Sequence, residues 1–340
     1  MGRKKKQGKK KVKQHYVPQF YLTGFTFDGD HLFVYDKFTR KSWRGSKRDI
    51  AHENYFYEIP TTMISKERRS EGINEKLLED ALAEYESKLG PAVRQMIDLE
   101  TDQLIPQELI AKMAFYVAIQ IMRTRGMRDE LIQGELAIYQ TLADGIRELN
   151  FPELPKGSVK IEFNEKFASF LQGRYIFDPE AQKEWVLGLG NMIWMIGLNE
   201  TRRPLYTSDN PVVKINHIKE VGSRGWLSQG VEIRFPLSPD RILLMCESSC
   251  FQQLLQYDRQ VVSISEQFVE DSNRRQIVGS HRQVFSKTDD FTQVEKVCDE
   301  RPEICQPRDR VEIETFAMTE GDTPSQRKQI WHLKMKDTDG

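Results

Sequence analysis

Cysteine is scarce in this sequence, which has only four in 340 residues. Cys246 and Cys250 lie four positions apart, and Cys298 and Cys305 lie seven apart among charged residues and prolines. Neither pair has the usual spacing of a zinc knuckle, so no structural zinc site is predicted. Four cysteines in a chain of this length are expected to be reduced thiols, as in the cytoplasm.

Long apolar segments are also missing. No run of about 18 apolar residues occurs, so we expect no membrane-spanning helix and no membrane partner. The N-terminus begins with charged residues that no apolar segment follows, so it does not resemble a secretory signal. These absences, together with the few cysteines, predict a cytoplasmic protein.

The common nucleotide and protease fingerprints are absent as well. The sequence has no Walker loop, no dinucleotide-binding glycine motif and no zinc-protease helix. Gly188, Gly190 and Gly197 lie within an apolar stretch that is predicted to be helical, and they do not follow a strand. A P-loop or dinucleotide-binding enzyme is therefore not expected.

Charge is unevenly distributed along the chain. Residues 1–13 carry eight Lys or Arg and no acidic residue, whereas the whole chain has a formal net charge of -1. The remaining residues therefore carry -9, and a basic tail precedes an acidic body. A tail of this composition is expected to be disordered and to contact nucleic acid locally, without sequence preference.

The apolar pattern predicts an α+β fold: a central helical group, about residues 73–198, flanked by an N-terminal β-rich segment and a C-terminal mixed sheet. Gly90 and Pro91 are expected to break or kink the first long helix. Residues 179–198 are predicted to form a helix buried on several sides, with Trp194 inside it. We expect a single domain over residues 14–287, followed by an irregular extension over 288–340.

Polar residues gather in one stretch between two apolar segments, Thr207-Ser208-Asp209-Asn210-Pro211. Ser, Asp and Asn side chains bond nearby backbone in tight turns, and Pro211 directs the residue before it towards extended geometry. A carboxylate, an amide and two hydroxyls at a strand end form either a well-capped turn or a functional site. The sequence leaves both interpretations open.

This stretch and four others resemble a bacterial family of domains of unknown function. The resemblance rests on HxVPxxYL from His15, residues 53–57, the TSDNP stretch, PLSP from Pro236, and residues 273–286, in that order. It implies that His15, Asp209 and Asn210 are family features, and it implies little about chemistry.

His15, Asp209, Asn210 and Glu53 are the candidate catalytic residues. A histidine with a carboxylate supplies the ligands of a divalent metal ion such as Mg²⁺ or Mn²⁺, or a general base with its orienting group. His15 and Asp209 would be the metal ligands, and they are predicted to lie within one bridged contact of each other. The alternative is that Asp209 bonds only local backbone amides and that His15 faces another part of the chain.

Arg123 and Ser208 are the candidate substrate-binding residues. Arg123 suits a phosphate or a carboxylate because its guanidinium is planar, and the alternative places it at a solvated helix end. Ser208 is a weak candidate nucleophile because no glycine-flanked elbow surrounds it. The His281-Arg282 and His52-Glu53 pairs are interpreted as structural.

Two classes of function remain open from the sequence, and a small-ligand sensor, which a thermal shift with nucleotides would reveal, is a third possibility. The first is a nucleic-acid-directed enzyme, such as a metal-dependent nuclease, with the His15 and Asp209 centre as its site and the basic tail as a tether. The second is a non-enzymatic binding or interaction module of a bacterial defence or mobile-element system, in which the same centre is structural. Neither oligomeric state nor substrate follows from the sequence.

Overall fold

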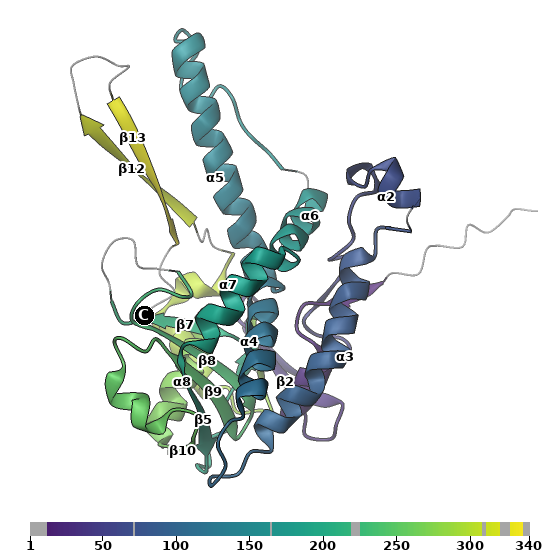
Figure 1. The fold of residues 1–340 in the computed structure, drawn as a ribbon, viewed down its shortest axis with the longest axis vertical. Helices are drawn as coiled ribbons and strands as arrows, with labels where there is room; N and C mark the ends of the chain where they lie inside the picture. The colour runs from purple at the N-terminus through teal and green to yellow at the C-terminus, as the bar shows by residue number, and fades with distance from the viewer. Residues whose placement is uncertain are drawn as a thin grey trace, which may run out of the picture.

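A computed structural model describes residues 12–70, 72–163, 165–218, 225–307, 311–319 and 327–335. The fold is α+β, as predicted, with helices packed on two larger sheets (Figure 1). Most of the predicted basic tail, residues 1–11, lies outside the described residues.

The larger sheet has five strands and is mixed, as predicted for the C-terminal half. Its order is β10(Val261–Ile264), β5(Ile193–Asn199), β9(Arg241–Cys246), β8(Val231–Ser238) and β7(Val213–Asn216). β10 runs parallel to β5, and the other neighbours are antiparallel. The sheet therefore has a helical layer on each face.

The predicted helix over residues 179–198 is wrong in its second half. Helix α7(Pro179–Gly190) ends at Gly190, and Ile193–Asn199 form β5. Ile193 and Met195 face one core cluster while Trp194 and Ile196 face another, so both faces of the strand are buried. A strand buried on both faces is apolar throughout, and its pattern cannot be told from that of a buried helix.

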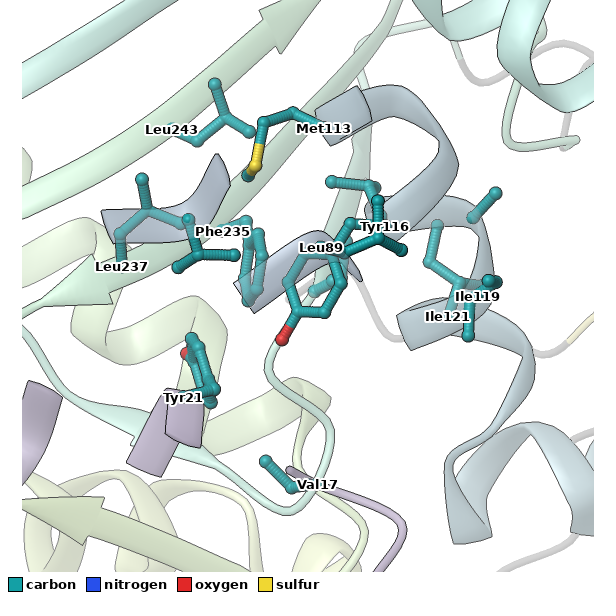
Figure 2. Packing of buried hydrophobic residues seen from close by; sticks show 14 of the residues in the cluster. Val17, Tyr21, Leu89, Met113, Tyr116, Ile119, Ile121, Phe235, Leu237 and Leu243 are labelled. Carbon is teal, nitrogen blue, oxygen red and sulfur yellow. The ribbon is translucent and has the colours of Figure 1, made fainter. Parts of the chain in front are cut away.

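Two long helices cover one face of this sheet. They are α3(Leu77–Ile97) and α4(Gln107–Met122). Figure 2 shows Met113 and Tyr116 among Tyr21, Phe235 and Leu243, and the Tyr21 and Phe235 rings stack with centroids 5.1 Å apart. Aromatic stacking and apolar burial at this junction fix the N-terminal segment to the sheet.

Of the predicted break or kink at Gly90 and Pro91, the break does not occur. Helix α3 continues through Pro91 to Ile97. Pro91 and Ser87 are both exposed, so water can bond the Ser87 carbonyl that the proline leaves without an amide donor. On the opposite side, Gly90 lies against the Phe20 ring.

The second sheet joins the two ends of the domain. Its order is β3(Lys41–Ser46), β2(His31–Asp36), β11(Gln283–Ser286) and β6(Thr207–Ser208), all antiparallel. The N-terminal hairpin is thus completed by strands from the C-terminal half and is not a separate β segment. A two-stranded ladder, β1(Lys13–His15) with β4(His52–Asn54), leads through Pro18 into α1(Gln19–Leu22) and η1(Thr23–Phe25).

The predicted irregular extension over residues 288–340 begins with regular structure. Helix α9(Thr292–Glu300) and η4(Pro302–Cys305) follow β11, and helix α8(Glu266–Gly279) precedes that strand. Val294, Val297 and Cys298 of α9 are buried in a cluster with Tyr35 and Phe291. The apolar pattern of α9 covers only a short segment, which explains why the sequence pattern did not reveal this helix. Strands β12(Val311–Thr319) and β13(Arg327–Met335) then form an antiparallel hairpin.

Helix α5(Arg125–Asn150) extends away from the two sheets, with α6(Glu165–Ile176) packed near its base (Figure 1). Strand β12 lies beside it. The remaining short elements are η2(Thr61–Met63), α2(Lys66–Ser70) and η3(Gln252–Tyr257). In the part of the chain that the structure describes, no helix combines the length and apolar character needed to cross a membrane.

Candidate functional site

Asp209 lies at the end of β6 and is buried, with 1% of its surface exposed. Its Oδ1 accepts a hydrogen bond from the His281 amide, and its Oδ2 accepts from the Arg282 and Gln283 amides, each at 2.8 Å. Burial raises the pKa of this carboxyl, while the three amides and the positive charge of Lys37 act in the opposite direction. The carboxylate therefore holds the loop between α8 and β11 in place.

The neighbours of Asp209 attach the same strand to α8. Ser208 is fully buried, and its hydroxyl donates to Gln276 Oε1 at 2.9 Å. The Asn210 side-chain amide donates to the Gly279 carbonyl at 3.0 Å. We name residues 206–211 the β6 clamp, because they bond α8 and the loop after it. The polar groups of Ser208 and Asn210 are both engaged in these bonds. Substrate binding by Ser208 and catalysis by Asn210 stay predictions.

His15 lies in a different cluster. Its ring meets the His52 ring across the β1–β4 ladder, with centroids 5.3 Å apart, and its Nε2 is buried without a hydrogen-bond partner among the described residues. Burial, and then the neighbouring His52, lower the pKa of His15 to about 4, so the imidazole is neutral at pH 7. Within the described chain no hydrogen bond or ion pair joins His15 to Asp209, and a shared site stays a prediction.

Arg123 borders the same cavity as His15, which has a volume of about 230 Å³. The guanidinium is almost fully buried; its Nη1 lies 2.8 Å from Glu86 Oε1, and its Nη2 donates to the His15 carbonyl at 2.7 Å. Arg123 does lie at a helix end, as the C-cap of α4, but this end is buried and not solvated. Arg123 does bind a carboxylate, but that carboxylate belongs to this chain.

Glu53 belongs to a third group, which we name the acid–base cluster: Glu53, Arg125, Asp129 and His281. Arg125 Nη1 lies 3.0 Å from Glu53 Oε2, and its Nε lies 2.9 Å from Asp129 Oδ1. His281 Nε2 lies 3.7 Å from Asp129 Oδ2. The β6 clamp positions this histidine, because Asp209 bonds the His281 backbone amide directly.

Tyr16 connects the clamp with the acid–base cluster. Burial raises the pKa of its phenol well above the usual value, and the charges of Asp209 and Glu53 act in the same direction. Sequence reasoning did not single out Asp129. It assigned His281 to an isolated structural pair, although that pair lies within one of the five motif segments. The position of His281 inside that segment was the signal available.

No group of three or more His, Cys, Asp and Glu side chains is arranged to hold a metal ion in the described part of the chain. In the structure, Asp209 directs both carboxylate oxygens to backbone amides. Both oxygens of Asp209 are thus occupied, and the Mg²⁺ or Mn²⁺ site suggested by the sequence stays a prediction.

The pKa of His15 predicts how stability depends on pH. The folded value of about 4 lies below the ordinary 6.5, so the unfolded chain binds a proton in this range that the folded chain does not. The free energy of unfolding is therefore expected to fall as pH drops from about 6.5 towards 4, and His15→Gln should flatten this slope. Urea denaturation between pH 4.5 and 7 measures it, with His31→Gln as the control. Equal slopes in the wild type and His15→Gln would contradict the assignment.

The distal part of α5 carries a surface of another kind. Its apolar side chains Ile138, Leu142, Ile146 and Leu149 are 47%, 43%, 59% and 82% exposed. Their spacing of four, four and three places them on one face of the helix. We name these four residues the α5 stripe.

Comparison with known proteins identifies one family model. The model described as "Protein of unknown function (DUF4238)" matches residues 13–290. No curated protein and no solved structure matches this chain.

Proposed function

Because this chain belongs to the DUF4238 family of proteins of unknown function, we propose its function from geometry: it is a binding module that pairs with a second copy of itself through α5 and holds nucleic acid with its basic tail. The observation that carries the proposal is the α5 stripe. This is the interaction-module class considered from the sequence, and we place it in a bacterial defence or mobile-element system.

The stripe is costly to leave in water. Full burial of each large aliphatic side chain contributes about 1.5–3 kcal/mol, so four of them on one helix strongly favour a partner. Helix α5 has 26 residues and spans roughly 39 Å, long enough to offer an interface beyond the body. The side chains of the α5 stripe are exposed to this extent even though β12 lies beside the helix.

A second copy is the partner that this geometry favours. In a two-fold pair the same patch faces itself, so one interface covers both stripes. An apolar stripe on a helix meets an identical stripe by packing side chains of one helix between those of the other. A second copy is also always present at the concentration of the first.

The tail supplies the nucleic-acid contact. Eight cations lie within residues 1–13, and the rest of the chain carries -9, so contact with phosphates is restricted to the tail. The tail directly precedes β1. Pairing through α5 gives the module two tails, and a second tail binds the same strand at high effective concentration.

A variant of the stripe tests this proposal. Ile146→Glu places a charge at the centre of the proposed interface, and we expect its affinity for a single-stranded 40-mer to fall by about 10²-fold, because one tail then binds alone. Fluorescence anisotropy at two salt concentrations measures it. Leu187→Glu, also exposed but on α7, is the matched control, and deletion of residues 2–13 should abolish binding in every variant. Equal affinity of Ile146→Glu and the wild type would reject pairing as the basis of binding.

The nucleic-acid-directed enzyme is the second candidate, and one observation favours it. His281 Nε2 lies 3.7 Å from Asp129 Oδ2 beside Arg125, so an imidazole and a carboxylate stand close enough for a small movement to join them by a hydrogen bond. The same samples, incubated with Mg²⁺ or Mn²⁺, reveal cleavage of DNA or RNA. Cleavage that is lost in His281→Gln would replace the binding module with an enzyme, whereas intact nucleic acid would support the module.

A further inference from the structure

A cavity that combines apolar walls with buried charge lies on the face of the five-stranded sheet turned away from α3 and α4. Its volume is about 610 Å³, within the range of small-molecule sites. The walls come from β5, β9 and β10, from η3 and from α8. They include Met195, Leu244, Phe251, Leu254, Val262 and Phe268.

One end of the cavity is polar. Arg234 of β8 is 6% exposed, and its Nη1 donates to Asp271 Oδ2 at 2.8 Å and to the Ser272 hydroxyl at 2.9 Å. Its Nε donates to Glu232, and its Nη2 forms no hydrogen bond to any described residue. The Phe268 ring lies 4.3 Å from the centre of the guanidinium. This packing fixes the orientation of the arginine, so its Nη2 is a preorganised donor.

The charge of this arginine is already compensated. Glu232 and Asp271 both bind it, and Arg275 lies 3.5 Å from the second oxygen of Asp271. The His217 ring lies 2.9 Å from the other oxygen of Glu232. An added anion would therefore lose its hydration without gaining an uncompensated positive charge. A neutral group that accepts one hydrogen bond loses less hydration than an anion when it enters the cavity.

Cys246 in the cavity wall does not act as a nucleophile. Burial raises the pKa of its thiol to about 12, and the charge of Glu232 acts in the same direction. The thiol therefore stays protonated and contributes apolar surface. The cavity is suited to binding and not to covalent chemistry.

We propose that this cavity binds a neutral, largely apolar small molecule, with an aromatic or aliphatic body between η3, α8 and the sheet and with one carbonyl-type acceptor bonded to Arg234. This site is independent of the α5 stripe and of the tail. Neither the acid–base cluster nor the β6 clamp contributes a residue to it.

The test uses 4-fluorobenzamide as the probe and fluorine NMR of the full chain as the readout. Binding is expected, and 4-fluorobenzoate should bind about tenfold more weakly, because its carboxylate adds an anion to the compensated charges. Leu254→Trp on η3 and Val262→Trp in the sheet wall should each remove binding by filling the cavity. Trp in place of the exposed Leu187 on α7 is the matched control and should leave binding unchanged.

Arg234→Lys tests the acceptor contact. It keeps the positive charge but loses the planar fork, so the affinity for 4-fluorobenzamide should fall about tenfold. The proposal is overturned if the probe does not bind, if the benzoate binds as tightly as the benzamide, or if Leu254→Trp binds the probe as the wild type does. Leu254 is only half-buried and lies on η3, outside the sheet, so its variant keeps the test valid even if Val262→Trp does not fold.

Discussion

Asp209→Ala is expected to lower the free energy of unfolding by about 3–5 kcal/mol. The substitution removes the buried carboxylate that accepts from three backbone amides, those of residues 281–283, and leaves these amides without that partner. An unsatisfied buried donor costs about 1–3 kcal/mol. Urea denaturation at pH 7 measures the change.

Asp209→Asn is the matched control for this prediction. Its side chain has the same shape and keeps one acceptor oxygen. The free energy of unfolding should therefore decrease less than in the alanine variant. If Asp209→Ala unfolds at the same urea concentration as the wild type, the β6 clamp does not hold the loop after α8. Asp209 would then be available for the metal or general-base role predicted from the sequence.

Trp194→Ala should cost about 3–5 kcal/mol, because it removes a fully buried indole from the centre of β5. The indole packs in the cluster below α3 and α4, and its Nε1 donates to the Leu189 carbonyl at 2.8 Å. The neighbouring structure can fill only part of the cavity that the substitution leaves. A decrease in melting temperature measures the effect.

Trp194→Phe separates packing from the hydrogen bond. It retains an aromatic ring and should cost less than the alanine variant, since the main losses are the Leu189 bond and part of the ring volume. A Trp194→Ala protein with an unchanged melting temperature would show that this residue does not support the core.

The fold class and the N-terminal elements were predictable from local pattern. The extended entry to Pro18, the short helix after it and the hairpin of β2 and β3 all follow from aromatic residues, proline and turn residues at short range. Strand β5 was not predictable in this way, because burial on both faces removes alternation. Its type is decided by β9 and β10, which come much later in the chain.

The polar stretch at Asp209 and Asn210 could be recognised from the sequence, but the partners of these side chains could not. Those partners lie about 70 positions further on, in α8 and the loop after it. His15 and Asp209 belong to different ladders, and a site that they share stays a prediction. Pairing over such distances depends on sheet topology, which a single sequence does not specify.

The α5 stripe could have been recognised from spacing, but its exposure could not. Apolar residues at positions 138, 142, 146 and 149 predict an amphipathic helix whose apolar face is normally buried in the same chain. Helix α5 extends away from the two sheets (Figure 1), and the exposed fractions of these side chains show that the described part of the chain covers this face only partly. An apolar stripe of this kind then becomes evidence for a partner.

Sedimentation velocity of the full chain over a wide range of concentrations tests the central claim most directly. The wild type should sediment as a dimer of the 39.8 kDa chain and dissociate on dilution, whereas Ile146→Glu should remain monomeric and Leu187→Glu should behave as the wild type. A wild-type protein that stays monomeric at every concentration, or an Ile146→Glu protein that still dimerises, would contradict pairing through α5.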